Sequence, residues 1–206
     1  YARRLYDAGD LAGALRVWPA QLEEERRALE TLLRRDGPAA LRGVSKRLRV
    51  FFVSAYQAYL FNRVLNARIE TLDQLYAGDV AFKHDSGGAF IVREPAAEQP
   101  RADRFEISPS GPLYGYRSLL AEGEPGELER RILADEGLEL SHFKALEALK
   151  VRGARRPLRF PLGEVESWYD AGVMLRFTLP AGCYATNVLA EVMKVEVEPA
   201  EEPAED

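Results

Sequence analysis

The chain has 206 residues, 47% hydrophobic and 30% charged, a composition that predicts a packed core and excludes a wholly disordered chain. Its net charge is −5, but six of the 33 acidic residues lie in the last eleven positions, and the rest of the chain carries 28 basic and 27 acidic residues. One cysteine and two histidines provide neither an internal disulfide nor a Cys/His zinc site. No apolar run is long enough to span a bilayer, and no secretory signal is present. We therefore expect a soluble, cytoplasmic, metal-free protein.

The first part of the chain is predicted to be helical. Asp10 can cap a short helix that ends at Val17, before Pro19. An apolar stripe predicts a second helix, which Asp36-Gly37-Pro38 breaks; its members are Leu22, Leu29, Leu32 and Leu33. Ser45 then opens the longest helical pattern.

This long pattern runs to about Ile69 and is apolar over much of its circumference. Such a helix belongs in the middle of a domain, so we expect it to form the spine of the fold.

The middle of the chain mixes short strands with helices. A hairpin is predicted from the runs 80–83 and 89–92, and residues 95–104 are expected to form a loop. A strand at 105–108 is expected to enter a shaped loop, Pro109 to Gly115, because this stretch holds two prolines and two glycines. Helices are predicted from Gly126 to about Asp135, and from a Ser141 cap to Leu149.

The last third predicts an extended segment, 150–162, because prolines bias the preceding residue away from the helix. A strand is predicted over 173–179 and an amphipathic helix over 183–194, whose inward residues are Val188, Leu189, Val192 and Met193. The fold class is α+β, with the helices concentrated early.

Basic residues form two clusters that contain no acid. The first holds Arg42, Lys46, Arg47 and Arg49, and the second holds Lys150, Arg152, Arg155, Arg156 and Arg159. Such clusters can bind phosphates by neutralising charge; the alternative is two solvated faces. No general catalytic signature accompanies them, and Gly78-Asp79 is typical of a turn.

Five stretches, in order, carry a family resemblance. They are Ser54 to Leu65, Gly78-Asp79 with Gly88 to Val92, Ile107 to Gly115, Gly153 to Leu158, and Leu175 to Thr186. Together they resemble the insertion domain and the following catalytic-domain segment of tRNA pseudouridine synthases of the D type.

The resemblance implies a mostly helical insertion domain with a small β-hairpin or sheet, followed by a strand, a turn and a helix of the catalytic domain. Residues 1–164 correspond to the insertion domain, with 1–44 as a poorly matched helical region. Residues 165–198 correspond to the catalytic-domain segment, and 199–206 form an acidic tail.

The family isomerises uridine-13 of tRNA to pseudouridine without a cofactor, using an aspartate in a Gly-x-Lys-Asp-x-x-Ala motif. None of the ten aspartates here has that setting, and the chain begins at Tyr1 rather than at methionine. We therefore expect a piece of a longer polypeptide, inactive alone, with no catalytic residue of its own. The alternatives are a non-catalytic RNA-binding module and a fragment that binds a protein partner; the oligomeric state is left open.

The resemblance implies tRNA as the partner, and eight residues are candidate RNA contacts: Lys150, Arg152, Arg155, Arg156, Arg63, Arg49, Tyr184 and Thr186. The basic residues would contact phosphates. A helix start after Gly182 would offer free N–H groups; alternatively, Thr186 satisfies the helix start and Tyr184 packs on the strand. Core packing is favoured over base stacking for Tyr56, Tyr59 and Phe61.

Overall fold

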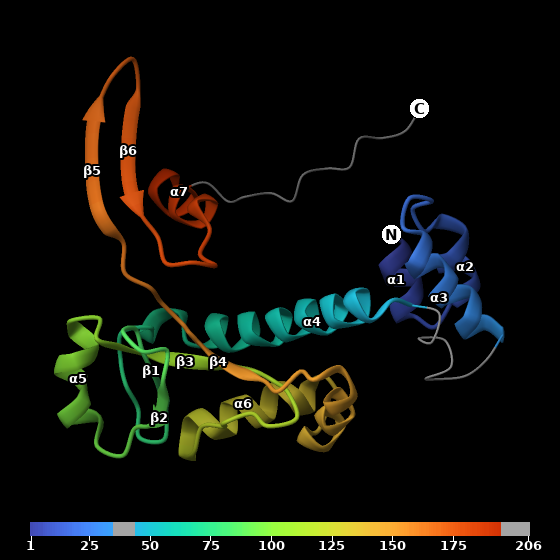
Figure 1. Ribbon diagram of the computed structural model, residues 1–206, viewed down its shortest axis with the longest axis horizontal. Coiled ribbons are helices and arrows are strands. Elements are labelled where there is room, and N and C mark those ends of the chain that lie inside the picture. Colours follow the sequence, from blue (N-terminus) through green and yellow to red (C-terminus); the bar gives the residue numbers. More distant parts are fainter. Residues whose placement is uncertain (35–43, 195–206) are drawn as a thin grey trace.

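Helix α4 (Lys46–Ala67) runs through the middle of the computed structural model, which describes residues 1–34 and 44–194 (Figure 1). The hydroxyl of Ser45 accepts a hydrogen bond from the backbone N–H of Leu48 at 3.3 Å and so caps the helix start. The helix packs against strand β3 (Ile107–Leu113) and helix α6 (Gly123–Asp135). The predicted central helix is confirmed, and its end lies two residues before the predicted one.

Three short helices precede α4 and lie near its N-terminal end (Figure 1): α1 (Ala2–Asp7), α2 (Leu11–Val17) and α3 (Glu23–Arg34). The predicted cap is confirmed, because the Asp10 carboxylate accepts a hydrogen bond from the N–H of Gly13 at 2.7 Å. The predicted break at Asp36-Gly37-Pro38, Arg42 of the first basic cluster and the acidic tail lie outside the described residues.

A four-stranded antiparallel sheet has the order β2-β1-β3-β4. It consists of β1 (Val80–Lys83), β2 (Ala89–Ile91), β3 and β4 (Ala154–Pro157). The predicted hairpin is β1–β2 and is confirmed. Helices α4 and α6 and the 3₁₀ helix η3 (Leu140–Leu149) enclose a core centred on Leu60, Phe61 and Tyr114.

The prediction of a shaped loop from Pro109 to Gly115 was wrong, because most of this stretch is the central strand β3. Proline removes one backbone donor but keeps its carbonyl. Residues 107–109 of β3 pair with β1, and residues 110–113 pair with β4. Each half of β3 therefore has a partner strand along only one of its two edges. The carbonyl of Pro109 still accepts a hydrogen bond from the N–H of Leu158 at 2.9 Å.

Two further predictions need correction. Residues 95–104, predicted as a loop, contain helix α5 (Pro95–Asp103). Proline is well placed at the first helical position, and the Gln99 side chain anchors the helix by accepting from Leu75 N at 3.0 Å and donating to Asp73 O at 2.8 Å.

The segment predicted as a helix capped by Ser141 is instead a 3₁₀ helix, η3, with Glu139 at its start. The His142 ring accepts a hydrogen bond from the N–H of Glu139 at 3.2 Å and takes part in a reciprocal capping box.

The Gly78-Asp79 pair is structural, as the turn interpretation predicted. The guanidinium of Arg68, at the C-terminal end of α4, binds the Asp79 carboxylate at 2.9 and 3.3 Å, and both side chains are buried. The same carboxylate accepts a hydrogen bond from the N–H of Tyr76 at 2.8 Å. Asp79 thus joins the end of α4 to the start of β1.

Beyond β4 the chain forms a separate hairpin, β5 (Gly163–Tyr169) with β6 (Val173–Thr178), followed by helix α7 (Ala185–Met193). The hairpin projects away from the four-stranded sheet (Figure 1). The strand prediction for β6 is confirmed, whereas β5 was not predicted. The inward orientation predicted for α7 is not seen at Leu189, Val192 and Met193, which are 36%, 56% and 60% exposed, whereas Val188 is partly buried.

A buried ion pair fastens β4 to α6 and β3. The guanidinium of Arg155 binds the Glu129 carboxylate at 2.8 Å, and the two side chains are 3% and 4% exposed. Arg155 also donates to the Ser110 hydroxyl at 3.0 Å, to the Ser110 carbonyl, and to the Leu119 carbonyl at 3.3 Å. Burial raises the pKa of Glu129 above its ordinary value, and the neighbouring guanidinium opposes that rise.

We predict that Arg155→Met and Glu129→Leu each lower the free energy of unfolding by about 3–5 kcal/mol, because either change leaves a buried charge without its partner. The double variant should recover part of the loss, since both charges are then gone. Urea denaturation of the four proteins measures the coupling. Arg176→Met, at an exposed ion pair on the hairpin, should change stability little; additive losses at Arg155 and Glu129 would contradict the role of the pair.

Candidate nucleic-acid interface

The second basic cluster extends from the turn before β4, across the two faces of β4, to Arg159 just beyond the strand. Neighbouring side chains of a strand point to opposite faces, so Arg155 and Arg156 diverge. Arg155 faces α6 and is buried, whereas Arg156 is partly exposed on the other face. The expectation that Arg155 contacts a phosphate was therefore wrong: its donors are occupied inside the protein.

Lys150 and Arg152 are exposed at the turn that leads from η3 into β4. Lys150 ends η3 in the left-handed region, with φ of 60°, and its N–H bonds the Glu147 carbonyl at 2.9 Å. The Arg152 carbonyl accepts a hydrogen bond from the N–H of Arg117 at 2.8 Å. The backbone here is fixed while both cationic side chains are open to solvent, which suits a phosphate contact.

Arg156 lies on an aromatic support. Its guanidinium carbon is 5.2 Å from the centre of the Phe61 ring, a cation–π distance. Phe61 reaches this place because Gly111, the β3 partner of Arg156, has no side chain; a Cβ there would come within 2.8 Å of the ring. Because Gly111 has no side chain, the Phe61 ring can lie where it supports the Arg156 guanidinium on β4.

The same guanidinium contacts the turn before α7. Its Nη2 donates to the Gly182 carbonyl at 3.5 Å, and Gly182 has the positive φ of 87° that favours glycine. Among the described residues, no carboxylate lies within ion-pair distance of Arg156. Its charge is therefore available to an anion at this junction.

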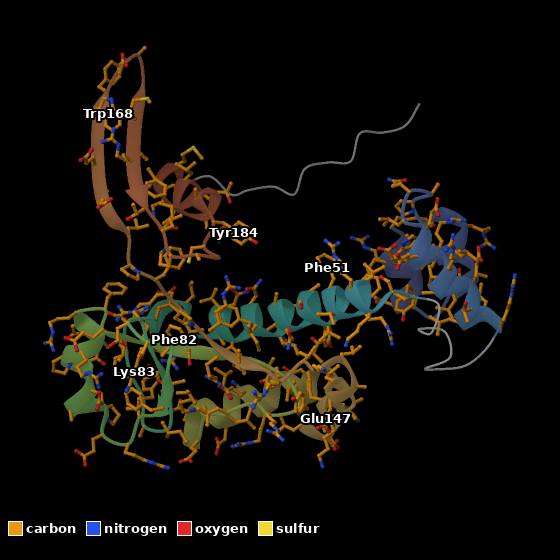
Figure 2. All side chains as sticks on the ribbon, viewed as in Figure 1. Phe51, Phe82, Lys83, Glu147, Trp168 and Tyr184 are labelled. Atoms are coloured by element: carbon orange, nitrogen blue, oxygen red, sulfur yellow. The ribbon has the colours of Figure 1, made fainter. Side chains whose placement is uncertain are left out.

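Tyr184 and Thr186 stand at the start of α7, next to this junction. Tyr184 is 66% exposed and extends into the open from the start of α7 (Figure 2), so it does not pack on the strand. Thr186 is exposed, and no side chain caps the helix start. Both alternatives that would have made these residues purely structural are wrong, and the first N–H groups of α7 are open to an acceptor.

Cys183, between Gly182 and Tyr184, is partly buried. Burial raises the pKa of its thiol, and the positive charge of Arg156 opposes the rise. The thiol of the only cysteine in the chain therefore lies close enough to Arg156 for the arginine charge to affect its pKa.

Arg63 is less suited to RNA because its charge is neutralised within the protein. Its guanidinium binds Glu136 at 2.7 Å and Asp135 at 3.0 Å. The Glu136 carboxylate also accepts hydrogen bonds from Tyr56 at 3.2 Å and Tyr59 at 2.7 Å, and these hydrogen bonds and Arg63 lower its pKa.

The first basic cluster lies at the start of α4. Lys46 and Arg47 are exposed, and Arg49 is partly buried, with a buried Nε that has no hydrogen-bond partner in the part of the chain described. Core packing is confirmed for Phe61, which is 4% exposed. Tyr59, at 46% exposed, is not a core residue; it stacks on Tyr56 at 5.7 Å.

Comparison with known proteins shows which family has this arrangement. A family model described as tRNA pseudouridine synthase D (TruD) matches residues 1–192, and so also covers the N-terminal region that the five stretches did not reach. The TruD proteins of Geobacter metallireducens and Geobacter sulfurreducens are 47% and 48% identical over 192 residues. The match covers 92% of this chain in both cases, but only 48% and 47% of those proteins.

A solved structure is also similar: the putative tRNA pseudouridine synthase D of Methanosarcina mazei, with a TM-score of 0.70 and 28% identity. The similarity covers 94% of this chain and 50% of that one. No helix within residues 1–34 and 44–194 is long and apolar enough to cross a membrane. The chain spans about half the length of the relatives it matches, and it belongs to the tRNA pseudouridine synthase D (TruD) family.

Proposed function

We propose that this chain supplies the RNA-binding part of an enzyme that isomerises uridine-13 of tRNA to pseudouridine. The observation that carries the proposal is the family match over residues 1–192, together with the cation of Arg156, which has no carboxylate partner among the described residues and lies beside the start of α7. The nucleophilic aspartate would belong to a part of the protein outside this sequence. No described residue is assigned a catalytic role.

The proposed contacts are Arg156, Arg152 and Lys150 with phosphates, and Tyr184 and the α7 N-terminus with a base or phosphate. Phosphate contacts fix the orientation of RNA without reading its sequence. Isomerisation requires the target base to leave its stack, so a surface that holds the RNA backbone supports the reaction without joining it.

The exposed apolar residues of the hairpin and α7 support an interface with the remaining half of the enzyme. Tyr169 and Val173 of the hairpin are 79% and 76% exposed, and Met193 of α7 is 60% exposed; exposed apolar surface of this kind marks interaction sites. We place the boundary between the insertion domain and the catalytic segment before Gly163. The predicted boundary, between residues 164 and 165, would divide β5.

The isolated chain should release no tritium from tRNA labelled at carbon five of uridine. Forming pseudouridine breaks the bond between N1 and the ribose and joins the ribose to carbon five, which loses its hydrogen to solvent. The coding sequence with its upstream frame should give a protein that releases tritium. Release by the isolated chain would contradict the position of the nucleophile, and an upstream frame without the Gly-x-Lys-Asp motif would favour the non-catalytic RNA-binding module.

The Arg152→Ala/Arg156→Ala variant should bind tRNA more weakly than the wild type. The slope of log Kd against log salt should fall by roughly 0.9 for each lost phosphate contact. Filter binding over a salt range of roughly 50 to 200 mM measures both the Kd and its salt slope. Arg93→Ala removes an exposed positive charge that is ion-paired with Glu122, and it serves as the matched control. If Arg93→Ala lost as much tRNA affinity, the weaker binding would be due to the change in net charge and not to these two arginines.

Alkylation of Cys183 by N-ethylmaleimide should slow when tRNA is bound, because the thiol adjoins Arg156 and Tyr184. High salt should restore the free rate by displacing the RNA. Mass spectrometry gives the modified fraction without ambiguity, since the chain has one cysteine. An unchanged rate at saturating tRNA would remove the α7 start from the interface.

A further inference from the structure

Arg159 belongs to the second basic cluster but points to a different place from Arg156. Its Nη2 donates to the Ala102 carbonyl at 2.6 Å, and its Nε donates to the Ser108 hydroxyl at 3.3 Å. Within the described ranges it forms no ion pair and its Nη1 has no hydrogen-bond partner. The guanidinium is thus held in position by neutral groups, with one nitrogen still free to donate.

An aromatic ring holds the other face of this guanidinium. The guanidinium carbon of Arg159 is 4.3 Å from the centre of the Phe105 ring. Phe105 has φ of 55°, a conformation that bulky residues rarely adopt and that marks functional sites more often than chance. The local backbone therefore places an aromatic ring under a cation at some conformational cost.

His84 completes the cluster at the end of β1. Its Nε2 lies 2.8 Å from the hydroxyl of Ser108, which is fully buried. This hydroxyl accepts from Arg159 Nε and can give its own hydrogen to His84 Nε2; in that arrangement the ring is neutral and Nδ1 carries the proton, whereas in the imidazolium form both ring nitrogens carry one. Burial, and then the charge of Arg159, lower the pKa of His84.

The cluster therefore presents two donors without protein acceptors in the described chain, Arg159 Nη1 and His84 Nδ1. Both residues are partly exposed, and neither nitrogen is among the buried unpaired atoms, so both reach solvent. Burial lowers the pKa of Arg159, and Asp73 and Asp103 oppose the shift without reaching ion-pair distance. A cation that has lost part of its water without gaining a carboxylate favours an anionic ligand.

We propose that Arg159 and His84 form a second phosphate-binding site, which takes a phosphodiester of the RNA backbone. The inference rests on the proposed function, because the phosphate is supplied by tRNA. The site lies where the end of β1 pairs with the start of β3. Two fixed points on the backbone would set the angle at which RNA crosses the insertion domain.

The charges around His84 determine its response to pH. Arg159 faces the ring, and the neighbouring charged groups are Lys83, Asp85 and Glu106, with Asp73 and Asp103 near Arg159. Glu106 is engaged by Arg104 at 2.8 Å. A bound phosphate would add a negative charge beside the ring and favour imidazolium. Bound RNA should thus raise the pKa of His84, and binding should strengthen as pH falls through that pKa.

The test is a pH titration of ¹³C-labelled histidine by NMR, with and without saturating tRNA. The chain has two histidines, and His142→Gln assigns the signals. We expect a rise in the pKa of His84 of at least about half a unit, larger than that of His142, which reports the general field of the RNA. Equal shifts, or no shift at His84, in a protein that binds tRNA would overturn the second site.

Affinity measurements give an independent result. Arg159→Gln should weaken tRNA binding by about tenfold and lower the salt slope by roughly 0.9. Arg159→Lys keeps the positive charge but loses the planar guanidinium group, so it should retain most of the salt slope of tRNA binding. Arg104→Gln, from the same region but ion-paired with Glu106, is the control, and thermal melts check that each variant folds.

Full affinity and slope in Arg159→Gln would overturn the second site. If only Arg152→Ala/Arg156→Ala has an effect, the proposed function stands and the second site does not. If the wild-type chain does not bind tRNA at low salt, both proposals are wrong.

Discussion

The bond network of Arg155 is the constraint on which the candidate interface depends. A buried guanidinium must satisfy its donors, and this one does so with Glu129 of α6 and with Ser110 of β3. These bonds fix which face of β4 points toward α6. Because the faces of a strand alternate, Arg156 must then point to the opposite side, onto Phe61 and toward Gly182.

Net charge says little about whether this surface can bind RNA. What matters is which basic side chains have no carboxylate as an ion-pair partner among the described residues. Arg63 and Arg155 are neutralised by α6 and its C-terminal end, whereas Arg156 and Arg159 rest on aromatic rings and bond to neutral acceptors. Aromatic support holds a guanidinium in place without cancelling its charge, which leaves its field available to a phosphate.

The two parts of the structure differ in how fully they bury their apolar residues. Helices α4 and α6 enclose a core in which Leu60 and Tyr114 are 0% and 1% exposed. The β5–β6 hairpin and α7 leave apolar side chains open, and the relatives are about twice as long as this chain. A sheet of two strands has too little surface to form a core of its own, which supports the proposal that this part packs against the remaining half of the enzyme.

Local signals in the sequence were enough to determine the Ser45 cap, the long helix and the β1–β2 hairpin, because each depends on residues near one another in the chain. The family followed from the order of five stretches along the chain. Local signals could not determine β3 or α5, since prolines there are tolerated only through tertiary pairing and anchoring by Gln99. Nor could they separate Arg155 from Arg156. Two neighbouring arginines look alike in sequence, and only the packing of β4 against α6 decides which is buried and which meets solvent.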